Sequence, residues 1–183
     1  MIETDRLRLR RWEPKDLIPF ANLNADPRVM EFFPASLTPE ETKAMFVSLT
    51  ERFDKHGFSF WATELKSTGE FIGFVGLNVP GYNLPFSPCV EIGWRIAFAH
   101  WGKGYAQEAA DSSLRYGFKV LKLKEIVSFT TVGNARSCRV MNRIGMRRDP
   151  DGDFLHPRLP EGHALRPHVL YRIDRTLADR ASD

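Results

Sequence analysis

The chain has 183 residues, of which 43% are hydrophobic and 27% charged, so a single domain with a substantial core is expected. This composition excludes disordered and fibrous classes, and the formal net charge of +3 suits a polyanionic small ligand as readily as RNA or a membrane surface. Cys89 and Cys138 are the two cysteines, no leader pattern is recognised, and the longest apolar stretch, Phe71 to Val79, is too short to span a bilayer. These features predict a cytoplasmic protein with free thiols.

The first third of the chain predicts one strand and two helices. Arg6 to Arg10 alternates strictly between arginine and leucine, which indicates a half-buried strand. A short helix is expected to begin at Asp16 and Pro19, because a proline in the first turn loses no hydrogen bond. The run Thr38-Pro39-Glu40-Glu41 is typical of a capping box, so a second helix is expected from there to Gly57.

The middle of the chain predicts three strands. Phe58 to Lys66 and Glu70 to Asn78 are separated by a short Ser67-Thr68-Gly69 turn and are expected to form an antiparallel hairpin. A proline-rich loop from Pro80 to Pro88 follows. Every second residue from Val90 to Ile96 is apolar, which predicts a strand that buries this set and turns the residues between them to the other face.

The last third alternates helices with strands. Small and apolar residues recur at helical spacing from Ala106 to Leu121, which predicts an amphipathic helix. Glu125 to Thr131 is expected to be a strand, Ala135 to Ile144 a helix closed by Gly145, and Val169 to Ile173 a last strand after a proline- and histidine-bearing loop. The order predicts a mixed α/β fold, in which ligands favour loops at the strand ends.

The glycine-rich loop from Trp101 to Ala106 is the most informative segment. It lies between a strand and a helix, and small residues at 102, 104 and 106 allow backbone amides to approach a ligand at the positive end of that helix. This pattern predicts a pyrophosphate site, and the alternative is a plain tight turn. A dinucleotide fingerprint and a Walker loop both fail, because no acidic residue closes the next strand and Lys103 precedes the second glycine.

A second motif follows, with Asn134-Ala135-Arg136-Ser137 and then Met141-Asn142-Arg143-Ile144-Gly145-Met146. The two motifs together resemble the GNAT-superfamily N-acetyltransferases, whose CoA loop follows the pattern Gln/Arg-x-x-Gly-x-Gly/Ala. Trp101 replaces the first residue, as in the ribosomal-protein alanine N-acetyltransferase (Rim-type) branch. The resemblance covers nearly the whole chain, from Thr4-Asp5-Arg6-Leu7 to His168-Val169-Leu170-Tyr171-Arg172.

The resemblance implies one GNAT domain over residues 1–183, with a mixed, largely antiparallel sheet flanked by helices. It implies transfer of an acetyl group from acetyl-CoA, as cosubstrate, to a primary amine, with a protein N-terminal α-amine favoured and small amines open. The alternative function is a non-catalytic module that binds CoA or a protein partner. No membrane or nucleic-acid partner is expected, because no motif for either is present, and the chain is expected to be a monomer or a homodimer.

The resemblance also implies the residues of the cofactor site. Backbone amides between Trp94 and Ile96 would stabilise the oxyanion, and Asn134 would hold the pantetheine arm or serve as a helix cap. The cofactor residues are Trp94, Ile96, Trp101, Gly102, Lys103, Gly104, Tyr105, Ala106, Asn134 and Ser137.

Two residues are candidates for the proton transfers. Glu91 would be the base, directly or through water, and the competing interpretation is a solvated glutamate or one salt-bridged to Arg95. Many GNAT enzymes use a tyrosine as the acid, but Met141 occupies that position here. Ser137 would supply the hydroxyl in its place, unless it is an ordinary first-turn helix serine.

Several other charged and ligating side chains are open to more than one interpretation. The arginines near the expected end of the CoA site would neutralise phosphates together with Lys103, or simply form a solvated face. Cys138 lacks a partnered base, so a packed thiol is expected rather than a nucleophile. The spacing of the histidines matches no zinc pattern, so no metal site is expected. These arginines are Arg136, Arg139, Arg143, Arg147 and Arg148, and the histidines are His156, His163 and His168.

Overall fold

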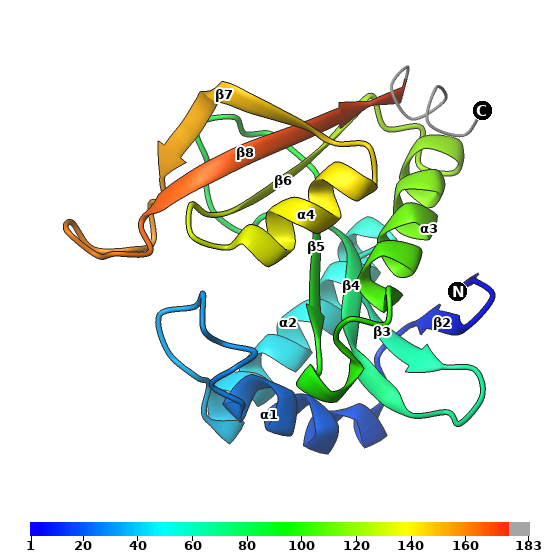
Figure 1. Cartoon of the computed structure of the whole chain (residues 1–183). Coiled ribbons are helices and arrows are strands. Elements are labelled where there is room, and N and C mark those ends of the chain that lie inside the picture. The colour runs from blue at the N-terminus through cyan, green and yellow to red at the C-terminus, as the bar shows by residue number, and fades with distance from the viewer. Residues whose placement is uncertain (176–183) are drawn as a thin grey trace.

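The computed structural model describes residues 1–175, which form one eight-stranded sheet with helices packed against it (Figure 1). None of the helices in this range is long and apolar enough to cross a membrane. In chain order the elements are β1 (Ile2–Glu3), β2 (Leu7–Arg10), η1 (Pro14–Asp16), α1 (Leu17–Ala25), α2 (Pro39–His56), β3 (Phe60–Leu65), β4 (Phe71–Asn78), β5 (Glu91–Ile96), η2 (Phe98–His100), α3 (Tyr105–Lys119), β6 (Glu125–Thr131), α4 (Ala135–Arg143), β7 (Arg147–Leu155) and β8 (Pro167–Asp174).

The sheet is largely antiparallel, as predicted. Its strand order is β1-β2-β3-β4-β5-β6-β8-β7, and β5 with β6 is the parallel pair. That pair needs a crossover connection, which η2, the glycine loop and α3 provide. Figure 1 shows α4 in front of the place where β5 and β6 separate from each other, with α3 to its right.

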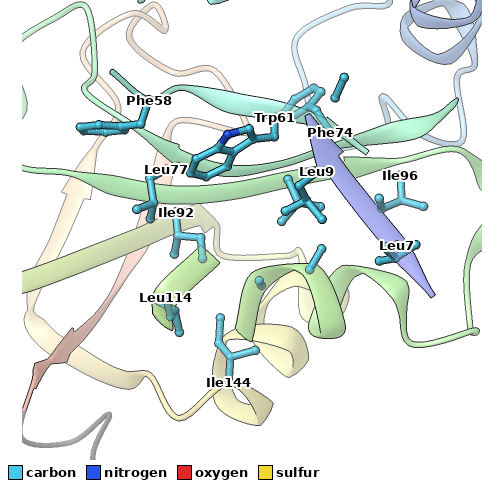
Figure 2. Close-up of a cluster of buried hydrophobic side chains, with 14 of the residues drawn as sticks. Leu7, Leu9, Phe58, Trp61, Phe74, Leu77, Ile92, Ile96, Leu114 and Ile144 are labelled. Atoms are coloured by element: carbon cyan, nitrogen blue, oxygen red, sulfur yellow. The ribbon is translucent and has the colours of Figure 1, made fainter. Parts of the chain in front are cut away.

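Helices cover both faces of the sheet. Phe74 of β4 meets Phe20 of α1, with ring centroids 6.0 Å apart, whereas Leu77 of the same strand lies against Gly117 of α3. Leu77 and Ile92 also belong to the buried apolar cluster drawn in Figure 2, together with side chains from α3 and the end of α4. The residues labelled there are Leu7, Leu9, Phe58, Trp61, Phe74, Leu77, Ile92, Ile96, Leu114 and Ile144.

The predicted helix boundaries are confirmed where the sequence carries a local signal. The Thr38 side chain accepts a hydrogen bond from the Glu41 amide at 3.1 Å, and the Glu41 carboxylate accepts one from the Thr38 amide at 2.8 Å. Gly57 ends α2 in the left-handed conformation with φ 78°. The first helix begins at Leu17 after the short turn η1, so Pro19 lies in its first turn as expected.

Strand β7 was not predicted, because its segment was assigned to the loop before the last strand. Its sequence, RRDPDGDFL, is polar and contains both proline and glycine, and it lies at the edge of the sheet with most side chains exposed. An edge strand needs no alternating apolar face, so its sequence carries no period-2 signal. Strand β8 also begins earlier than expected, at Pro167.

Candidate active site

Strands β5 and β6 touch at one end and then diverge. Their ladder consists of one pair, Glu91 with Val127, supported by a hydrogen bond of 3.0 Å from the Val127 amide to the Val90 carbonyl. The Ser128 hydroxyl donates to the Ile92 carbonyl at 2.9 Å. Beyond Ile92 no ladder pair joins the two strands within residues 1–175, so a gap opens in the middle of the sheet.

Two backbone amides of β5 point into this gap. The Ala97 amide donates to the Ile72 carbonyl of β4 at 2.9 Å, and amides alternate in direction along a strand, so those of Trp94 and Ile96 face the opposite way. The Ile96 carbonyl confirms this direction, because it accepts a hydrogen bond of 2.7 Å from the Trp101 indole nitrogen. Trp101 is thereby fixed beside the gap.

The glycine loop leads from η2 to α3. Gly102 and Gly104 have φ angles of 74° and 79°, a conformation that glycine adopts without strain. The backbone conformation, and not a lack of space, favours glycine at position 102, because a Cβ there would meet no atom within 4 Å. Gly104 is the N-cap of α3, so the unpaired amides of a 15-residue helix begin here.

These elements surround one cavity of about 910 Å³. Glu91 and every predicted cofactor residue except Lys103 line it. Lys103 is exposed on the glycine loop, and its carbonyl accepts a hydrogen bond of 3.0 Å from Arg6. The lining residues that had been predicted are Glu91, Trp94, Ile96, Trp101, Gly102, Gly104, Tyr105, Ala106, Asn134 and Ser137.

The Glu91 carboxylate faces the cavity in a polar network that the sequence did not reveal. Asn78 donates to its Oε1 at 2.6 Å, and Arg52 donates to the Asn78 side-chain oxygen at 2.8 Å. Burial raises the pKa of Glu91 to about 7, although the hydrogen bond from Asn78 and the charge of Arg52 act in the opposite direction. Arg95, considered as a salt-bridge partner, instead donates to Asn24.

Asn134 is a helix cap, as one of its two interpretations predicted. Its side-chain oxygen accepts from the Ser137 amide at 3.1 Å, and its side-chain nitrogen donates to the Thr130 hydroxyl at 3.0 Å. Ser137 follows in the first turn of α4 and lines the cavity. Met141, one turn further on, lines it as well and is 1% exposed.

The predicted arginine cluster divides into two groups. Arg136, Arg139 and Arg143 lie on α4 and line the cavity, whereas Arg147 and Arg148 belong to β7 and do not. The Arg136 guanidinium lies 4.7 Å from the Trp101 ring centroid and forms an ion pair with Glu31; Arg148 forms an ion pair with Asp153.

The cavity also has an aromatic wall that was not predicted, formed by Tyr82, Phe129, His156 and His168. The Tyr82 hydroxyl and the His156 Nε2 are 3.0 Å apart, and the rings of His156 and His168 are 4.8 Å apart, beside Phe129. Burial, with the charges of His168 and Arg158, lowers the pKa of His156 to about 4. These side chains come from three distant segments, so no spacing in the sequence connects them.

The geometry of the site is compatible with the chemistry of CoA. The helix-start amides, with Arg139 and Arg143, suit a pyrophosphate, and the Trp94 and Ile96 amides that point into the gap suit an extended amide-bearing arm. The Glu91 carboxylate, with its raised pKa, lies beside that gap. This combination of fold and site is the one expected of a CoA-dependent acyltransferase.

Comparisons with known proteins give the family. The model of the acetyltransferase (GNAT) domain matches residues 6–147. YkkB of Bacillus subtilis is 39% identical over 78% of this chain and 83% of its own length. The N-acetyltransferase YnaD, also of B. subtilis, is 31% identical over 94% of this chain and 95% of its own. The chain therefore belongs to the GNAT family, and it is an acetyl-CoA-dependent N-acetyltransferase.

Solved structures agree on the fold. A GNAT-family acetyltransferase from Bacillus anthracis has a TM-score of 0.77 and 29% identity over 94% of this chain and 97% of its own. The ribosomal-protein-S5-alanine acetyltransferase of Vibrio fischeri has a TM-score of 0.72 and 22% identity over 94% of both chains. Spermidine N-acetyltransferase of Vibrio cholerae, solved with CoA and spermine, has a TM-score of 0.74 and 21% identity over 96% of this chain and 99% of its own.

Proposed function

We propose that this enzyme transfers the acetyl group directly to an α-amine at the N-terminus of a peptide or protein, with Glu91 as the base. One observation carries this proposal: the Glu91 carboxylate, with its pKa raised to about 7, faces the cavity beside the gap amides. The ordinary pKa of an α-amine is about 8, whereas that of a lysine amine is about 10.4. Because of this difference between the amines, an α-amine gives up its proton to Glu91 more readily than a lysine does.

The residues around the gap divide the reaction between them. Glu91 takes the amine proton, directly or through a water, as nitrogen attacks the thioester carbon. The amides of Trp94 and Ile96 donate hydrogen bonds to the carbonyl oxygen as it gains negative charge. When the carbon–sulfur bond breaks, the Ser137 hydroxyl stabilises the thiolate with a hydrogen bond, or gives it a proton that the hydroxyl regains from solvent.

The remaining predicted residues hold the cosubstrate. The amides that begin at Gly104 and the guanidinium groups of Arg139 and Arg143 receive the phosphates, while Asn134 contacts the pantetheine arm. Both polar ends of the Asn134 side chain already have partners, but its oxygen has a second lone pair that remains available to an amide N–H.

The test measures thiol release from acetyl-CoA with short peptides of free and blocked N-termini, lysine side-chain amines and spermidine. Rapid release with free N-termini and little with the other amines is expected. Glu91→Gln should lose most of this rate and keep its affinity for acetyl-CoA, whereas Glu40→Gln, an exposed glutamate on α2, should change neither. CoA binding without any thiol release would instead support the non-catalytic module.

A further inference from the structure

Arg95 is a buried cation at the wall of the cavity. It lies on β5, is 8% exposed, and donates one hydrogen bond, from Nη1 to the Asn24 side-chain oxygen at 2.5 Å. Its Nε is buried and has no hydrogen-bond partner. Its guanidinium lies 4.2 Å from the ring centroid of Phe33 and 5.3 Å from that of Phe74.

A second buried arginine of this chain, Arg10, has carboxylate partners for its guanidinium. Arg10 is 7% exposed, and its guanidinium is 2.7 Å and 2.8 Å from the two carboxylate oxygens of Asp16 and 2.8 Å from Glu64. In the described part of the chain no carboxylate forms an ion pair with Arg95, and burial alone lowers its pKa to about 10. Arg95 therefore stays charged at neutral pH without a counter-ion, which is costly in a protein interior.

Arg95 lies on the same face of β5 as the proposed base, Glu91. Glu91, Gly93 and Arg95 occupy alternate positions of β5, so they share one face of the strand, and all three line the cavity. The Cα atoms of Glu91 and Arg95 are about 13 Å apart for an extended strand. Phe60 lies over Gly93 between them, at 3.1 Å from where a Cβ would be.

We infer that Arg95 binds a carboxylate of the acceptor, so that the substrate is an amine that also carries a carboxylate, separated from the amine by a short apolar or peptide spacer. Guanidinium and carboxylate form strong, oriented hydrogen bonds, and the low polarity around Phe33 and Phe74 strengthens them. This inference rests on the proposed function, because Glu91 defines where the amine lies. The carboxylate has two sources, the C-terminus of a very short peptide or an acidic side chain near the N-terminus of a longer one.

Matched acceptors that differ only in this group provide the test. The panel pairs Ala-Ala with Ala-Ala-amide, Ala-Ala-Ala with its amide, and Ala-Glu-Ala-amide with Ala-Gln-Ala-amide. All of them keep the same α-amine. In at least one pair the carboxylate member should have a kcat/KM about 10- to 100-fold higher, as expected for a hydrogen bond to a charged group. The first two pairs report a terminal carboxylate and the third reports a side chain.

Variants assign the preference to Arg95. Arg95→Met should remove the preference, so that each carboxylate peptide and its matched partner are turned over with the same kcat/KM. Arg95→Lys should retain part of the preference. Arg11→Met, at a surface arginine with 63% of its side chain exposed, should leave the preference for carboxylate peptides unchanged.

The outcomes separate this inference from the proposed function. Equal turnover of both members in all pairs would overturn the role of Arg95 and leave N-acetylation of α-amines intact. If no peptide is acetylated, the proposed acceptor is wrong, and calorimetric titration of Ala-Ala and Ala-Ala-amide into the CoA-bound protein decides the role of Arg95 alone. Equal affinities there, or a preference that survives in Arg95→Met, would overturn it. Loss of stability in Arg95→Met without any preference in the parent would make Arg95 structural.

Discussion

At the scale of single residues, the protonation of Glu91 controls the proposed chemistry. Only the carboxylate form accepts a proton, so kcat/KM should show an inflection at about pH 7 that belongs to Glu91, beside a second one near about 8 that belongs to the acceptor α-amine. Glu91→Gln should remove the first inflection and lower the rate about a hundred- to ten-thousand-fold. A full pH–rate profile of both proteins provides the measurement, and a variant with a near-parental rate at every pH would return Glu91 to a structural role.

Asn78 tunes this inflection. Its hydrogen bond to Glu91, 2.6 Å long, stabilises the charged carboxylate and lowers the pKa that burial raises. Asn78→Ala should therefore move the inflection to higher pH and reduce the rate most at or below neutral pH. Circular dichroism must show the same fold, because Asn78 also accepts a hydrogen bond from Arg52. An inflection that stays in place or moves to lower pH would contradict this assignment.

A catalytic role of the Ser137 hydroxyl can be tested without disturbing the cap of α4. The cap of α4 uses the backbone amide of Ser137 and the side chain of Asn134, so Ser137→Ala keeps the cap. A catalytic hydroxyl predicts a large loss of rate, about a hundred-fold or more, with a nearly unchanged melting temperature. Single-turnover rates and thermal melts should be compared. A parental rate would leave protonation of the thiolate to water.

At the scale of elements, the turn before α3 is the part that depends most on residue type. Gly104→Val places a β-branched residue at φ 79° and crowds the helix-start amides, so affinity for CoA should fall sharply. Gly69→Val is the matched control, because Gly69 has φ 72° in a turn that does not line the cavity. Both variants carry a similar backbone strain. Equal affinities in calorimetry would mean that the phosphates bind elsewhere.

Elements with local signals could be predicted from the sequence, and long-range pairs could not. The capping box at Thr38 and the glycines of the loop are dictated by backbone conformation, which a few consecutive residues determine. The alternation of β5 likewise placed Glu91 and Arg95 on one face. The partner of Arg95, in contrast, is 71 residues away in the sequence, and contacts of this kind depend on how the elements pack.

At the scale of the whole molecule, a buried ionic network joins β2 and β3 to η1, which leads directly into α1. Asp16 is 1% exposed and forms two hydrogen bonds with Arg10, which also contacts Glu64 of β3. Asp16→Ala removes one partner from a buried pair and should lower the free energy of unfolding by about 3–5 kcal/mol. Asp54→Ala, which removes an exposed partner of Arg11, should lower it by less than about 1 kcal/mol. Urea denaturation measures both, and equal losses would contradict the importance of this network.

The distribution of tryptophans gives the protein an optical reporter of its own site. Trp12 and Trp61 are 7% and 3% exposed in the core, whereas Trp94 and Trp101 line the cavity. Indole emission depends on contact with solvent and with neighbouring charged groups, and Trp101 lies between the Ile96 carbonyl and the Arg136 guanidinium. Cosubstrate binding should therefore change the emission of the cavity pair while the core pair supplies a constant background, so binding can be followed without any added label.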